Sequence, residues 1–155
     1  MQITDQNIAK ETCIKLLSEK RQVKIRMTGN SMFPFIKNGE TCIIQPIITN
    51  ETIIRNGDVL LFRKNDRLIA HRLLKIKINN GKYHYLCKGD SCIRTDGLID
   101  SENIIGKVIA IVKANKIKQI NNLKRNLIIA KISIFLIPFY YLFWTLKKLI
   151  PKRNY

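Results

Sequence analysis

The sequence predicts a mainly β fold, in which an antiparallel β domain follows a short N-terminal helix and precedes a C-terminal hydrophobic helix. Three observations predict it. Between residues 21 and 113, short runs rich in Ile, Val, Leu and Phe alternate with Gly, Asn and Asp, as in sheets built from hairpins. An amphipathic stretch lies before this region, and a long apolar run lies after it. With 155 residues, 46% of them hydrophobic, the chain is long enough for one compact domain and an appendage.

Residues 1–20 are expected to form the N-terminal helix. Asp5 can cap its start, apolar residues then recur between charged ones, and the pattern ends before Arg21. The same stretch contains acids and amides where a secretory signal needs a basic start and an unbroken apolar run. We therefore expect no exporting signal at this end.

The β domain, residues 21–113, is expected to contain strands separated by turns. Turn signals rich in Asn, Asp and Gly occur at residues 37–39, 55–57, 64–66 and 79–81. The expected strands are Val23–Met27, Thr41–Gln45, Asp58–Arg63, Leu68–Ile78, Lys82–Lys88 and Ile104–Lys113.

After a polar, basic connector at residues 114–126, residues 127–155 are expected to form a membrane-associated hydrophobic helix and a basic tail. Leu127–Leu146 is apolar except for Lys131, and a helix of this length reaches about 30 Å, the thickness of a hydrocarbon core. Aromatic residues and then basic ones complete the segment, as at membrane interfaces. Lys131 and Pro138 weaken a spanning helix, so a spanning and an interfacial helix both stay open.

The formal net charge of +17 is unevenly distributed. Residues 1–102 carry 17 basic and 11 acidic side chains, whereas no acidic residue follows Glu102. Because the C-terminal cations interleave with apolar residues, they favour contact with membrane lipid over contact with nucleic acid. The four cysteines show no CxxC spacing and favour free thiols over metal ligands. We expect neither a metal nor an organic cofactor.

Three groups of residues in the β domain carry candidate chemistry. Amide hydrolysis needs a nucleophile, a base, a group that orients the base, and donors for the oxyanion. Taken singly, a turn serine such as Ser31 caps backbone, and a histidine in an apolar strand such as His71 is a satisfied core residue. In chain order the groups are Gly29–Pro34 with Gly39, Gly57–Phe62 with Ala70–Arg72, and Lys88–Asp90 with Asp96 and Gly106–Val108.

In this order and at these spacings, the three groups resemble the signal peptidase I superfamily of serine peptidases, over roughly Val23 to Val112. They are most similar to the endoplasmic-reticulum-type branch, whose general base is a histidine. The resemblance implies a signal-peptidase-like β domain with Ser31 as nucleophile and His71 as base. It favours Asp96 as the triad acid, with Asp90 as a structural or supporting acid, and leaves the choice between them open.

The resemblance is incomplete in the loop after Asp90, where Ser91 and Cys92 depart from the family pattern. A serine–lysine dyad would need Lys75 or Lys88 in the place of His71, against the spacing. Related self-cleaving repressor peptidases use such a lysine base together with a DNA-reading domain, and the sequence indicates neither.

The residues around the nucleophile are expected to stabilise the oxyanion and to bind substrate. The backbone N–H of Ser31 is the expected oxyanion donor, with Thr28 or Asn30 as open additions because Gly29 stands where many family members carry a hydroxyl. Substrate contacts are expected at Met32, Phe33 and Pro34, with core packing or lipid contact as alternatives for the first two.

The resemblance, together with the hydrophobic C-terminal segment, therefore predicts a membrane-associated serine endopeptidase that cleaves a signal or leader segment from precursor proteins or peptides. Its expected partners are a peptide or preprotein substrate and membrane lipid, and its expected location is the cell membrane, held by a single C-terminal anchor. The membrane face of the β domain stays open. Such an anchor normally leaves the preceding domain in the cytoplasm, whereas cleavage of a signal peptide would need the opposite face. Two alternatives are a cytoplasmic-side leader peptidase for peptide maturation and a catalytically idle peptide-binding membrane adaptor.

Overall fold

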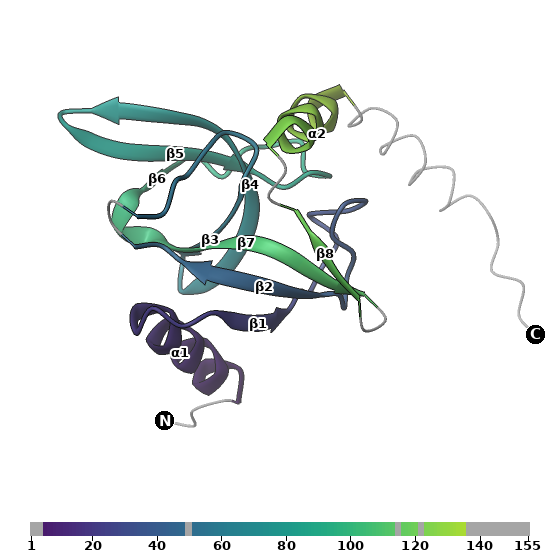
Figure 1. The fold of residues 1–155 in the computed structure, drawn as a ribbon. Helices are drawn as coiled ribbons and strands as arrows, with labels where there is room; N and C mark the ends of the chain where they lie inside the picture. The colour runs from purple at the N-terminus through teal and green to yellow at the C-terminus, as the bar shows by residue number, and fades with distance from the viewer. Residues whose placement is uncertain (1–4, 49–50, 114–115, 121–122, 136–155) are drawn as a thin grey trace, which may run out of the picture.

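The computed structural model describes residues 5–48, 51–113, 116–120 and 123–135, and these form one antiparallel sheet with one helix before it and one after it in the sequence (Figure 1). This confirms the prediction of a mainly antiparallel β fold with a short N-terminal helix. The elements are α1 Asp5–Ser18, β1 Val23–Arg26, β2 Thr41–Pro46, β3 Val59–Lys64, β4 Arg67–Asn79, β5 Lys82–Lys88, β6 Leu98–Asp100, a short 3₁₀ turn at Ser101–Asn103, β7 Ile104–Lys113, β8 Lys116–Gln119 and α2 Leu123–Phe135.

The strands pair in the order β1-β2-β7-β3-β4-β5-β6, and β8 also pairs with β7. Two of the expected turn signals form tight hairpins. Asn65 and Asp66 join β3 to β4 with φ of 46° and 60°, and Asn80 and Gly81 join β4 to β5 with φ of 49° and 73°. Positive φ at both central residues gives a hairpin turn whose twist matches that of its strands. These hairpins place β3, β4 and β5 side by side.

Strand β3 lies between the two halves of the core. Its residues Val59 and Leu61 belong to a cluster with Ile44, whereas Leu60 and Phe62 belong to a second cluster on the other side. Successive side chains of a strand point to opposite faces, so a strand covered on both faces reads as an unbroken apolar run. The run Val59–Phe62 is therefore the central strand of the core.

Two strands, β6 and β8, were not expected from the sequence. β6 has only three residues, and the four residues of β8 are all exposed and half of them are lysines. β8 forms because its backbone pairs with Ala110–Lys113 at the end of β7. It lies inside the segment expected to be a connector, as does the start of α2.

Two strand edges stay open near one another in the described part of the sheet. β1 is the terminal strand, so only one of its edges is paired, with β2. β5 pairs with β4 only from Arg72 onward, so Arg67–His71 of β4 pair with β3 alone. Such edges present unpaired N–H and C=O groups to an incoming chain. They border the candidate site.

Helix α2 packs against the β domain through its first turns. A Cβ at Gly57 would lie 2.7 Å from the main-chain carbon of Asn126, so the helix backbone rests directly on this turn. The Asn126 side chain donates a hydrogen bond to the carbonyl of Ile120, and Ile129 and Ala130 are buried.

The expected hydrophobic segment, Leu127–Leu146, is described only as far as Phe135, and its remainder lies outside the described residues. Within the described part, the helix begins at Leu123, four residues before the expected start, and contains 13 residues. No helix among the described residues is both long enough and apolar enough to cross a bilayer.

Candidate active site

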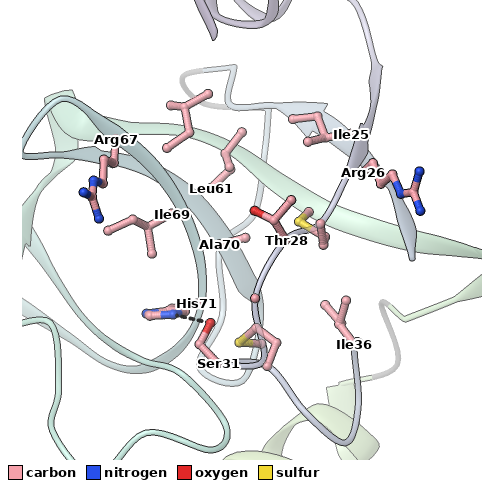
Figure 2. A pocket seen from close by; sticks show the side chains of 14 residues that line it. Ile25, Arg26, Thr28, Ser31, Ile36, Leu61, Arg67, Ile69, Ala70 and His71 are labelled. Carbon is pink, nitrogen blue, oxygen red and sulfur yellow. Dashed lines mark hydrogen bonds between the residues drawn. The ribbon is translucent and has the colours of Figure 1, made fainter. Parts of the chain in front are cut away.

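Ser31 stands in a tight turn that follows β1. Hydrogen bonds from Phe33 N–H to the carbonyl of Asn30, and from Phe35 and Ile36 N–H to that of Met32, close the turn. Gly29 enters it with φ of 84°, a left-handed conformation that glycine adopts without strain, and its N–H donates to Oδ1 of Asn38. The turn holds the serine side chain at the mouth of a cavity (Figure 2).

His71 comes from β4 and points at this serine. Its Nε2 lies 2.9 Å from Oγ of Ser31, and its Nδ1 lies 2.8 Å from Oδ2 of Asp96. His71 is 9% exposed, with Phe62 edge-on to its ring at 6.2 Å between centroids. The three side chains that the sequence nominated as nucleophile, base and preferred acid therefore form one continuous hydrogen-bonded chain.

Asp96 is held by contacts of its own backbone. Its N–H donates to the carbonyl of Cys87 at 2.9 Å, and its carbonyl accepts a hydrogen bond from Nζ of Lys64 at the end of β3. Both contacts leave the carboxylate free to face His71. Lys64 was not nominated from the sequence, because a lysine before a turn is ordinarily a solvated residue.

Asp90 takes a different partner. Arg72 donates to both of its carboxylate oxygens, each at 2.7 Å, and donates a third hydrogen bond to the carbonyl of Gly57 at 2.8 Å. The Asp90 side chain is fully buried and that of Arg72 is 3% exposed. Burial raises the pKa of the Asp90 carboxyl, and the guanidinium opposes that rise. Asp90 is thus part of a buried ion pair beside the site.

The loop between these two aspartates lies against the serine turn. Ser91 donates its N–H to the carbonyl of Ser31 at 2.9 Å and its hydroxyl to that of Asn30 at 2.7 Å. Lys88 donates to the carbonyls of Gly89 and Cys92, and burial lowers the pKa of its ammonium. Lys88 therefore fastens the loop instead of reaching the serine.

The other histidine and the cysteines lie apart from this arrangement. His84 pairs with the exposed Asp100 at 2.8 Å between β5 and β6, outside the site. The four cysteines are free thiols. Burial, assisted by a neighbouring carboxylate in each case, raises the pKa of Cys42 and Cys87 to about 12, so neither is a nucleophile.

A cavity of about 330 Å³ opens beside Ser31 and His71. Figure 2 shows Leu61, Ile69 and Ala70 on one side of it and Ile25, Thr28 and Ile36 on the other. Its lining is largely apolar, and it runs along the open edge of β4. An extended chain with small or apolar side chains fits such a wall.

The expected substrate-contact residues fall into different places. Met32 is 6% exposed, belongs to the core cluster around Ile44, and also lines the cavity. Phe33 is 38% exposed and Pro34 is half-buried, and neither lines the cavity. Thr28, one of the open oxyanion candidates, is exposed and lines the cavity.

Comparison with known families adds one result. A family model described as Peptidase S24-like matches residues 3–109. The chain belongs to the Peptidase S24-like family. Membership confirms the expected superfamily and indicates a peptidase-type function, whereas the endoplasmic-reticulum-type branch and its Ser-His-Asp site stay predictions. No curated protein matches the chain significantly.

Gly89 provides a test of how tightly this S24-like site is packed. A Cβ at Gly89 would lie 2.8 Å from the carbonyl oxygen of Ser31, 3.1 Å from Nε2 of His71 and 2.6 Å from Sγ of Cys92. We expect Gly89→Ala to lower kcat at least about 100-fold, because a displacement near 1 Å costs that much when reacting groups must align. The measurement is peptidase activity per folded molecule.

Gly106→Ala is the matched control. A Cβ there would be just as crowded, 2.5 Å from Cγ2 of Ile44 and 2.9 Å from the carbonyl of Gln45, but in β7, away from Ser31. It should lower the melting temperature without a comparable loss of activity in the folded fraction. Equal kcat values for the two variants would contradict the packing described for Gly89.

Proposed function

We propose that this chain is a serine endopeptidase in which Ser31 is the nucleophile, His71 the general base and Asp96 the acid that orients it. The observation that carries the proposal is the hydrogen-bonded chain from Oγ of Ser31 through both nitrogens of His71 to Asp96. A serine hydroxyl is a weak nucleophile until an adjacent base takes its proton. Family membership supports this assignment, since it makes peptide hydrolysis the prior expectation.

The reaction follows from these positions. Nδ1–H of His71 donates to Asp96, which leaves Nε2 as the acceptor for the Ser31 proton. As Oγ bonds to the peptide carbonyl carbon, the proton passes to Nε2, and Asp96 stabilises the imidazolium. His71 then protonates the departing amine, the C–N bond breaks and an acyl-enzyme remains. Water, deprotonated by His71, hydrolyses that ester and returns Ser31.

The oxyanion formed in each step needs donors close to the nucleophile. We assign the backbone N–H of Ser31 to this role, because a nucleophile in a tight turn presents its own amide to the bound carbonyl oxygen. The Thr28 hydroxyl is the proposed second donor, since it is the hydroxyl before the nucleophile that lines the cavity. Neither donor involves Asn30.

The substrate proposed for this site is an extended segment of a precursor protein or peptide. The open edge of β4 from Arg67 to His71 supports it, because a peptide can add to such an edge through main-chain hydrogen bonds. Removal of a signal or leader segment follows from the resemblance to signal peptidases. A cytoplasmic active site would make it a leader peptidase for peptide maturation instead.

Membrane attachment is the second part of the proposal, and the outward face of α2 supports it. The exposed residues of this helix recur at one-turn spacing and combine lysines with large apolar side chains: Lys124, Leu127, Ile128, Lys131 and Ile132. A helix with this composition lies in the headgroup region of an anionic bilayer. The apolar sequence continues to Leu146, so the proposed attachment includes further apolar residues that can contact lipid.

We expect Ile128→Glu combined with Ile132→Glu to weaken binding of the full chain to vesicles that contain phosphatidylserine by at least about tenfold. These side chains are 56% and 40% exposed, and burying two isoleucines in part is worth about 2 kcal/mol. Ile78→Glu is the control, because Ile78 is 66% exposed on the distant β4–β5 hairpin. If the α2 variant and the control bind alike, α2 does not contact lipid.

A fluorophosphonate probe tests the proposed chemistry directly. Such a reagent phosphonylates an activated serine, so mass spectrometry should find the adduct on the peptide that contains Ser31 and not on other serines. Ser31→Ala should take up no probe, and His71→Ala should slow labelling strongly. An unlabelled Ser31 in a chain that still binds peptides would instead identify a catalytically idle adaptor.

A further inference from the structure

The cavity beside Ser31 continues into a second, larger groove of about 1,100 Å³. Both are lined by Ile25, Arg26 and Thr28 on the β1 side and by Arg67 and Leu68 on the β4 side, so they form one channel. The second groove runs on between β1, the tip of the β3–β4 hairpin and α1. Figure 1 shows α1 beside β1 at this end of the molecule.

The charge along this groove is one-sided. Four basic side chains line it, Lys10, Lys24, Arg26 and Arg67, and one acidic side chain, Asp66. Asp66 is already neutralised, because its carboxylate lies 2.8 Å from Nζ of Lys10. Lys24, Arg26 and Arg67 are exposed, and none of them forms an ion pair within the described residues.

The geometry of the walls fits an extended peptide. The groove follows β1, the terminal strand of the sheet, and the start of β4, which β5 leaves unpaired. A strand laid along either edge places its alternate side chains on the same wall, about 7 Å apart. Lys24 and Arg67 come from these two strands, so they flank such a peptide from different sides. Arg26 lies two residues after Lys24 on the same exposed face of β1, and Figure 2 shows it pointing away from the Ser31–His71 pair, toward the more distant part of the channel.

We propose that this groove selects substrates that carry Asp or Glu several residues from the scissile bond, with Lys24 and Arg67 as the residues that determine the preference. The proposal rests on the proposed function, since the bound segment is the continuation of the peptide held at Ser31. It gives the substrate class a chemical definition. In such a substrate, a small or apolar residue lies near the scissile bond, and acidic residues lie further along the same peptide.

The bulk charge of +17 is not sufficient for this preference, because it acts on any acidic peptide without regard to position. The β4–β5 hairpin provides the comparison, since Lys75 and Lys82 are also exposed but lie outside the channel. Charge reversal there changes the net charge equally. A preference that depends on position in the peptide, and on groove residues alone, separates the groove from the bulk field.

The test uses the full chain with Ser31→Ala and fluorescent peptides that bind without turnover. In a matched series, one Gln or Asn at a time becomes Glu or Asp on either side of the expected cut. We expect each acidic residue that falls in the groove to tighten binding about threefold, the usual strength of an exposed ion pair, and high salt to remove the gain. Positions outside the groove should show no gain.

Lys24→Glu combined with Arg67→Glu should reverse the ratio of acidic to neutral affinity, whereas Lys75→Glu combined with Lys82→Glu should preserve it. The proposal is overturned if no position shows an acidic preference, or if both double variants change the ratio equally. Cleavage by the intact chain is measured in parallel. Hydrolysis without an acidic preference refutes only the groove, and an acidic preference without hydrolysis refutes only the peptidase assignment.

Discussion

Asp96→Asn is expected to lower kcat about 10⁴-fold while the protein stays folded. Asparagine keeps the size of the side chain but favours the wrong tautomer of His71, so Nε2 no longer accepts the serine proton, and the imidazolium loses its neighbouring charge. The loop itself should not move. Its position depends on the backbone N–H and C=O of Asp96, which bond to Cys87 and Lys64 and which asparagine retains.

Single-turnover cleavage of a precursor peptide, with circular dichroism to check the fold, measures this effect. The chain offers a matched control in its other histidine–carboxylate pair. His84 and Asp100 are also 2.8 Å apart, but Asp100 is 62% exposed and pairs with a histidine that does not contact Ser31. Asp100→Asn should therefore leave kcat unchanged. If Asp96→Asn retains more than a tenth of the wild-type rate, another group orients His71.

Arg72→Met is expected to lower the free energy of unfolding by roughly 3–5 kcal/mol. The substitution leaves a fully buried Asp90 carboxylate without its cation. Removing one partner of a buried ion pair destabilises a protein more than removing both, because an unpaired charge stays buried. It also removes the hydrogen bond to the carbonyl of Gly57. Urea unfolding followed by circular dichroism measures the loss.

The pH dependence of this variant has a definite sign. Without the guanidinium, Asp90 loses the strongest influence that opposes burial, so its folded-state pKa rises further above the unfolded value of about 4. A group with a raised folded pKa favours the folded state at low pH and loses that contribution as pH rises through the folded pKa. The stability deficit of Arg72→Met should therefore shrink in acid and grow toward neutral pH.

Two further variants isolate the ion pair. Arg72→Met combined with Asp90→Leu should recover part of the stability, because removing both charges leaves no buried carboxylate. Lys113→Met breaks the pair with Glu40, which is also 2.8 Å long but partly exposed, and should cost less than about 1 kcal/mol. Equal losses for Lys113→Met and Arg72→Met would show that burial of the Asp90 pair has no special cost.

The sequence was sufficient to predict the features that neighbouring residues in the chain determine. Asn-Asp and Asn-Gly turns dictate two hairpins, and the unbroken run Val59–Phe62 marks a strand buried on both faces. β8 could not be predicted, because nothing in Lys116–Gln119 favours a strand until β7 offers it an edge. Its pairing is a tertiary effect, as is the packing of α2 on Gly57.

The choice between the two aspartates also depended on tertiary structure. From the sequence, either carboxylate of the loop was within reach of His71. In the fold, His71 and Arg72 are successive residues of β4 and point to opposite faces, so each takes a different aspartate. Asp90 pairs with Arg72 on one face of β4, and Asp96 bonds to His71 on the other face. The crowding around Gly89 was invisible for a similar reason, because Ser31, His71 and Cys92 come from different segments.

The packing of α2 on Gly57 limits how far the chain can be shortened from its C-terminal side. Gly57 is the residue whose carbonyl anchors Arg72, and Ile120, Asn126 and Ile129 enclose a small cavity against Arg72, Phe35 and Ile36. Cutting after Lys113 would therefore bare the back of the serine turn and let water reach the Arg72–Asp90 pair. A cut after Phe135 removes the apolar run that follows but retains this cover over the serine turn.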